Sequence, residues 1–226
     1  MERPINEDIS QQLEQPKPKI YLPEVREFIV NDSFLKWGIE QLKEIDDDGN
    51  TLRHSQRITN LGYRLAKKLN FSEEKEYDFL EACLLHDIGK ISTPASILMK
   101  PHDEFTDEDM EVVRKHPREG KEILEMQGRS PRVCNAVLLH HEFQKKSYPA
   151  LGAEYREIED IDVDNARLLA MLDVFDTVVF GRQNIEPVPE EMRKITWMKQ
   201  FDQKGDEEII DFFLSQYETI NNLSKP

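Results

Sequence analysis

The segment from His86 to Lys90 contains the three side-chain types that metal-assisted phosphate chemistry uses. Its imidazole, carboxylate and ammonium groups follow an apolar helical pattern over residues 76–85, and Gly89 predicts the end of that helix. A histidine and an aspartate at the end of a core helix cost free energy unless something pairs with them. A bound cation would do so, and a hydrogen-bonded His86–Asp87 pair without metal is the simpler alternative.

The positions of the other histidines favour a metal centre. Five of the six stand where an apolar helical stripe faces the interior or at a helix end: His54, His86, His116, His140 and His141. Only His102 has the pattern of a loop residue. Buried imidazoles with the carboxylates of Asp87 and Asp173 form a ligand set that suits iron, manganese or zinc. These candidates are too many for one ion and suit two, which can share a bridging carboxylate and a hydroxide for in-line attack on phosphorus.

Helical periodicity predicts the elements that would position these side chains. Helices are expected over residues 23–45 in two parts, 51–69, 73–87, 107–117, 120–126, 131–141, 165–179, 189–199 and 206–223, with Ser72 and Thr106 as N-caps. His54 lies on an apolar stripe, Asp173 and Asp176 share one side of a helix, and Pro117 predicts His116 at a helix boundary. No segment alternates with the period of a strand, so the predicted fold class is all-α.

Composition limits the environment and the partners. The formal net charge is −15 for 226 residues, which argues against a nucleic acid polymer held on a basic face. An anionic substrate would instead need local cations, such as bound metal, Lys90, Lys145, Lys146 and Arg182. Cys83 and Cys134 lie in apolar helical patterns and are predicted to be reduced core thiols. With no signal-peptide pattern and no membrane-length apolar run, we expect a cytoplasmic protein that does not contact a membrane.

The order and spacing of the motifs resemble the HD-GYP branch of the HD phosphohydrolase superfamily. The resemblance covers about residues 50–185 and rests on His54, His86-Asp87-Ile88-Gly89-Lys90, Pro94, Ile97-Leu98, Lys100, His116-Pro117, Gly120, His140-His141-Glu142 and Asp173-Val174-Phe175-Asp176. It implies a helical bundle around two divalent metal ions, most often iron or manganese. It also implies hydrolysis of a cyclic dinucleotide such as cyclic di-GMP, in bacteria.

The resemblance assigns a role to each matching residue. The implied metal ligands are His54, His86, Asp87, His116, His140, His141 and Asp173. Asp87 would be the bridging carboxylate, and Lys90 would contact the substrate phosphate and stabilise charge on its oxygens. Asp176, one turn beyond Asp173, either orients a ligand imidazole or is an ordinary carboxylate on a helix face.

The chain departs from the family pattern around the expected substrate pocket. In the signature loop Tyr148 and Pro149 match, but the Asp-Gly pair is absent, Ser147 replaces a glycine and the loop is one residue shorter. The downstream Arg-x-Tyr-Arg stretch is reduced to residues 181–184, which leaves Arg182 as the candidate phosphate contact, with Tyr148 as a further substrate contact. Asn50 stands where some members carry a glutamate for a third metal, which favours two metals.

These features predict three parts of the chain and leave other functions open. Residues 1–19 are predicted to be a disordered tail, residues 20–50 helices packed on the bundle, and residues 51–226 the HD-GYP-like domain. One alternative function is a nucleotide-binding or protein-interaction signalling module that has lost turnover. Another is an HD-fold di-iron oxygenase. A homodimer or a regulatory partner protein is compatible with each.

Overall fold

The computed structural model describes residues 21–45, 50–144, 147–149, 160–181, 187–198 and 209–216. The predicted tail over residues 1–19 lies outside these ranges, as do Lys145, Lys146 and Arg182. None of the described helices is long and apolar enough to cross a membrane.

The described residues form helices and contain no strand, which confirms the predicted all-α class. The α-helices are α2 (Pro23–Val30), α3 (Ser33–Glu44), α4 (Asn50–Lys68), α5 (Glu73–Leu85), α6 (Ala95–Leu98), α7 (Asp107–Val113), α8 (His116–Met126), α9 (Pro131–Leu139), α10 (Asp160–Phe180) and α11 (Glu190–Met198). Two short 3-10 helices, η1 (Ile88–Ser92) and η2 (His102–Glu104), flank α6, and residues 209–216 form a further helix.

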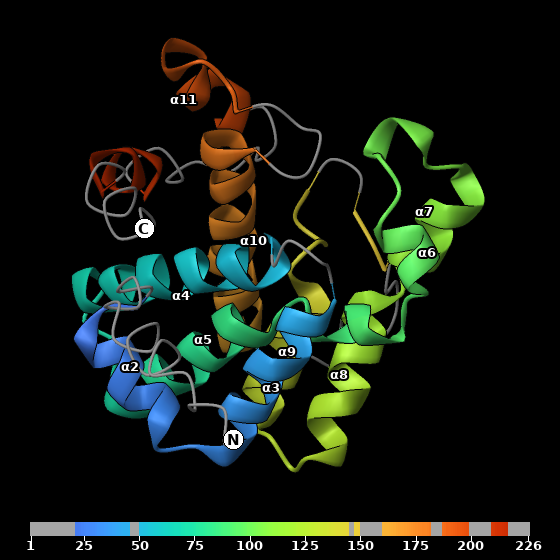
Figure 1. Ribbon diagram of the computed structural model, residues 1–226. Coiled ribbons are helices and arrows are strands. Elements are labelled where there is room, and N and C mark those ends of the chain that lie inside the picture. Colours follow the sequence, from blue (N-terminus) through green and yellow to red (C-terminus); the bar gives the residue numbers. More distant parts are fainter. Residues whose placement is uncertain are drawn as a thin grey trace, which may run out of the picture.

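Helix α10 is the central element of the bundle. It runs through the middle of Figure 1 with α4 crossing it, and it packs against α9, α4, α5 and α11. Leu169, Leu172 and Phe175 of α10 are fully buried. Helix α3 lies on α4, α5 and η1. The boundary predicted at residue 50 stays a prediction.

Capping side chains fix where several helices begin. Ser72 accepts a hydrogen bond from the backbone N–H of Lys75, and Thr106 forms a capping box with Asp109, so both predicted N-caps are confirmed. Asp32 caps α3 by accepting from the N–H groups of Phe34 and Leu35, which explains the predicted break between α2 and α3.

The prediction that Gly89 ends the preceding helix was wrong. Helix α5 ends at Leu85, and Gly89 lies inside η1. A Cβ atom on Gly89 would lie 2.0 Å from the backbone oxygen of His116 and 2.5 Å from the nitrogen of Gly120. The glycine therefore allows η1 to pack directly on the backbone of α8.

Two helix boundaries also differ from the prediction. The helix capped by Thr106 ends at Val113, and His116 begins α8, so the predicted boundary at His116 is a start. Pro117 fits there because the first turn of a helix does not use its missing N–H. Helix α10 begins at Asp160 and not at residue 165. The sequence of residues 160–164 lacks the apolar periodicity of a helix, so the pattern did not include it.

Candidate metal centre

Two groups of buried side chains at the centre of the bundle could each hold a metal ion. One consists of His54, His86 and Asp87, and the other of His116, His140 and His141. In each group, ligand atoms of the three side chains lie within 4.8 Å of one another. All six residues are at most 6% exposed. The structure therefore brings together six of the seven ligands that the sequence suggested, and Asp173 lies beside them.

The helix ends hold three of the imidazoles in one tautomer. In His86, His116 and His140, Nδ1 lies 2.6 to 3.0 Å from the carbonyl oxygen three residues earlier. A carbonyl oxygen only accepts, so Nδ1 donates and carries the proton. In a neutral ring this leaves a lone pair on Nε2, which is the atom a metal needs.

His54 is held in the same tautomer by a carboxylate. Its Nδ1 donates to Oδ2 of Asp176 at 2.7 Å, and Asp176 is fully buried. The Nε2 atoms of His54 and His86 are 3.1 Å apart, and those of His116 and His140 are 3.3 Å apart. Neither pair can form a hydrogen bond if both rings are neutral, because both nitrogens then carry lone pairs.

The nitrogen spacings and one buried atom fit bound cations. Two nitrogens about 2.1 Å from one ion lie about 3.0 to 3.4 Å apart in octahedral or tetrahedral geometry. His141 Nδ1 is buried and has no hydrogen-bond partner. An imidazole donor set with carboxylates suits iron, manganese or zinc. The residues present therefore fit divalent metal ions.

Asp87 lies between the two groups of histidines. Its Oδ1 is 3.3 Å from Nε2 of His116, and its Oδ2 is 3.6 Å from Nε2 of His86. Asp173 also faces both groups, with Oδ1 3.1 Å from His54 Nε2 and Oδ2 3.8 Å from His141 Nδ1. Either carboxylate is thus positioned to contact both ions of a pair.

The histidines of the second group are buried in their neutral form. Desolvation lowers the pKa of His116, His140 and His141 well below the ordinary value. Asp87 acts in the opposite direction on all three, and Asp173 does so on His140 and His141. Neutral imidazoles are ready to bind metal without releasing a proton. Lys90 brings a positive charge to the edge of the cluster, with Nζ 2.6 Å from Asp87 Oδ2.

Asp176 lies behind the cluster and belongs to an ion pair that the sequence did not reveal. Arg57 binds it through Nε at 2.6 Å and through a terminal nitrogen at 2.7 Å, and the guanidinium also covers the ring of Phe180. Burial raises the pKa of Asp176, but Arg57 and His54 outweigh this and hold it at about 2. Asp176 is therefore not an ordinary carboxylate on a helix face. Arg57 stands three residues after His54, the one sequence signal that could have indicated it.

Two more residues lie beside the second group of histidines. The ring of Tyr148 stacks on His141 with centroids 4.3 Å apart and an interplanar angle of 25°. The guanidinium of Arg114, which sequence reasoning also missed, lies 5.9 Å from the centre of the Tyr148 ring. The other predicted cations, Lys145, Lys146 and Arg182, lie outside the described residues.

Sequence comparison identifies relatives over most of the chain. The HD domain family matches residues 43–204. The chain is 33% identical over 194 residues to a cyclic di-GMP phosphodiesterase of Thermotoga maritima, covering 81% of this chain and 51% of that protein. It is 36% identical over 139 residues to the cyclic di-GMP phosphodiesterase response regulator RpfG of Xanthomonas campestris, and the match covers 60% of this chain and 35% of that protein. The chain thus spans about a third to a half of the length of these relatives.

A solved structure shares the fold. The HD domain of the phosphodiesterase PgpH of L. monocytogenes superposes with a TM-score of 0.52 at 18% identity, covering 83% of this chain and 93% of that one. A second structure of that domain, in complex with cyclic-di-AMP, gives a TM-score of 0.51 at 19% identity, covering 83% and 91%. At this level of identity the likeness shows a common helical fold.

Proposed function

The chain belongs to the HD-domain family, within which its motifs and relatives support the HD-GYP branch, and we propose that it hydrolyses a phosphodiester bond of a cyclic dinucleotide. The convergence of five buried imidazoles and two carboxylates, with Lys90 at their edge, carries this proposal. The relatives named as cyclic di-GMP phosphodiesterases support cyclic di-GMP as the substrate.

Each side chain has a role in the proposed centre. His54, His86, His116, His140, His141 and Asp173 would hold two divalent ions, with Asp87 shared between them. We propose iron or manganese as the metals, since nitrogen and oxygen ligands suit both. When bound, such ions lower the pKa of a coordinated water and neutralise charge on phosphoryl oxygens.

The protein residues orient the substrate and complete its electrostatic stabilisation. Lys90, which now pairs with Asp87, would contact a phosphoryl oxygen and stabilise the charge that grows there in the transition state. Tyr148, stacked on His141, would also contact the substrate, and Arg182 is a further proposed phosphate contact. Asp176 would fix the orientation of His54 through Nδ1. We also propose a cytoplasmic location, because both cysteines are buried and free.

The decisive experiment combines metal analysis with product analysis. Protein loaded with iron or manganese without oxygen should convert cyclic di-GMP to a linear dinucleotide or mononucleotide. Asp87→Ala should lose both bound metal and turnover, whereas Asp103→Asn, at an exposed position, should keep both.

Other outcomes would replace the proposal. Metal-loaded protein that binds but does not cleave cyclic dinucleotides would be a binding module. A product that forms only with oxygen would indicate an oxygenase. Absence of metal in protein purified anaerobically would contradict both enzymatic functions.

A further inference from the structure

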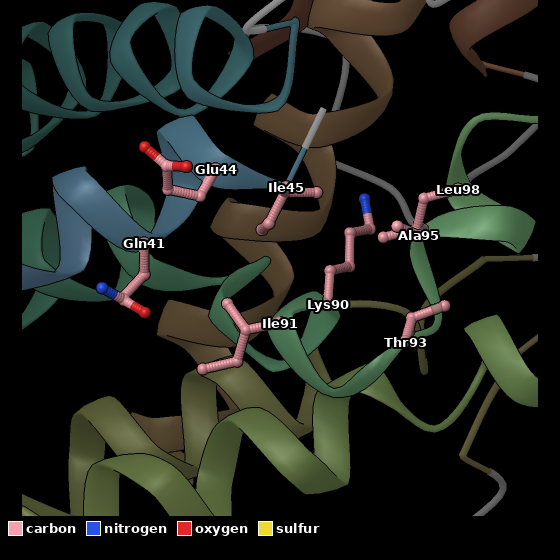
Figure 2. A pocket seen from close by; sticks show the side chains of 8 residues that line it. All are labelled: Gln41, Glu44, Ile45, Lys90, Ile91, Thr93, Ala95 and Leu98. Carbon is pink, nitrogen blue, oxygen red and sulfur yellow. The ribbon is translucent and has the colours of Figure 1, made fainter. Parts of the chain in front are cut away.

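A cavity of about 280 Å³ lies beside the cluster, between the end of α3 and the segment from η1 to α6 (Figure 2). Its lining consists of Gln41 and Glu44 from α3, of Ile45 directly after that helix, and of Lys90, Ile91, Thr93, Ala95 and Leu98. Figure 2 shows Lys90 between the α3 residues on one side and Thr93, Ala95 and Leu98 on the other. The cavity is thus made jointly by the N-terminal helices and the metal-binding bundle.

Lys90 connects the cavity to the cluster. Its side chain lines the cavity, and its ammonium group is 2.6 Å from Asp87 Oδ2. A ligand whose phosphate reaches Lys90 can therefore place its neighbouring group in the cavity. Pockets for drug-sized ligands measure about 300 to 1,000 Å³, so this cavity suits part of a ligand and not a whole cyclic dinucleotide.

One residue of the cavity lining has a buried polar atom that lacks a partner. Thr93 is 6% exposed, and its hydroxyl oxygen is buried without a hydrogen bond. A buried polar group without a hydrogen bond costs free energy. A ligand atom that forms a hydrogen bond with the hydroxyl would remove this cost. Ile45 and Leu98, which are also buried, provide apolar surface for a flat ring.

We propose that this cavity binds one guanine base of the substrate, which rests on the proposed function of the same site. The planar ring would pack on Ile45 and Leu98, with its N1–N2 edge towards the side chains of α3 and the opposite edge towards Thr93. Guanine presents two adjacent donors, N1–H and N2–H. A carboxylate such as that of Glu44 can accept a hydrogen bond from each of them. Adenine has an acceptor at N1, which a carboxylate repels. Gln41 and Glu44 are thereby assigned as determinants of base specificity.

Binding of mononucleotides to the manganese-loaded full chain tests the assignment without requiring turnover. Isothermal titration should show GMP binding roughly tenfold more tightly than AMP. Glu44→Gln should weaken GMP binding roughly tenfold and leave AMP nearly unchanged, because one acceptor is replaced by a donor. The matched control is Glu40→Gln, one turn earlier on α3, whose carboxylate pairs with Lys43 at 3.4 Å and does not line the cavity.

Thr93→Val provides a second, independent test. It keeps the shape of the side chain and removes the hydroxyl, and should weaken GMP binding about fivefold while Thr93→Ser restores most of it. Inorganic phosphate, which has no base, should bind the parent and all variants equally.

The assignment is overturned if GMP and AMP bind equally to the parent, if GMP does not bind, or if Glu44→Gln and Glu40→Gln behave alike. The proposed function fails separately, if cyclic di-GMP is not cleaved while GMP binding still depends on Glu44.

Discussion

Replacement of Arg57 by methionine should weaken the metal centre through Asp176, although Arg57 is not itself a proposed metal ligand. Its guanidinium makes two hydrogen bonds to Asp176, and Asp176 is fully buried against His54. In Arg57→Met that carboxylate loses its cation in a low-dielectric site, and its pKa must rise from about 2. Once protonated, Asp176 can donate to His54 Nδ1, which moves the ring proton to Nε2 and removes the lone pair from the cluster.

The structure sets the size of the expected effect. Breaking a buried ion pair costs about 3 to 5 kcal/mol, and the lower end applies because the Arg57 side chain is 15% exposed and water can replace part of it. The metal-free variant should therefore unfold with a free energy about 3 kcal/mol lower. Loss of a group that orients a ligand imidazole should weaken metal affinity about 10-fold to 100-fold.

Two measurements check this prediction, namely chelator competition for metal affinity and urea unfolding of the metal-free protein. The affinity of Arg57→Met should fall further as the pH is lowered from 7 to 5, because Asp176 then becomes protonated. Arg57→Lys should lie between parent and methionine variant, since it keeps the charge but not the paired hydrogen bonds. Arg53→Met, at the exposed Arg53–Asn50 contact on the same helix, is the matched control. Unchanged metal affinity in Arg57→Met would refute the reasoning.

Three further predictions concern regions behind the centre. Arg129→Met should lower the free energy of unfolding by about 3 kcal/mol in urea titrations without changing metal content, because it leaves the buried Glu81 without its cation. Gly89→Ala should lower the free energy of unfolding by about 3 kcal/mol and also reduce the amount of bound metal, because the added Cβ pushes α8 away. A variant that binds as much metal as the parent protein would contradict the close packing of η1 on α8. Burial raises the pKa of Cys83 well above its ordinary value and that of Cys134 to about 11. At pH 8 both thiols of the folded protein should therefore react with a disulfide reagent about 100-fold more slowly than those of protein unfolded in urea, and the rate should increase as the pH rises. Rapid reaction of the folded protein would show that the thiols are accessible.

Much of the cluster could be predicted because its residues follow local rules. His54 and Asp173 lie on helical stripes of period 3.6, and His86 and His140 directly follow the last residues of α5 and α9. The residues within about one helical turn of each of these side chains determine its position, so a single sequence is enough to predict it. The convergence of these positions on one point needed the family resemblance.

The contacts that the sequence did not reveal join distant parts of the chain. Arg57 is 119 residues from Asp176, and Arg129 is 97 residues from Asp32 and 48 from Glu81. An arginine side chain is usually solvated, and neither the helix of Arg57 nor the loop of Arg129 contains the acidic partner. Gly89 was misread for the same reason, since its environment is the backbone of α8, which local pattern rules do not include.

The spread of the candidate ligands along the chain has a consequence for the order of folding. His54 and Asp173 are 119 residues apart in the sequence, and both face the same cluster. An ion held by both would close a loop of that length, as a disulfide does. The conformational entropy that the unfolded chain loses on such closure increases with the length of the loop. During synthesis, the complete ligand set cannot form until α10 has left the ribosome. A truncation before residue 160 should therefore leave the earlier histidines without Asp173, the ligand that would close this loop.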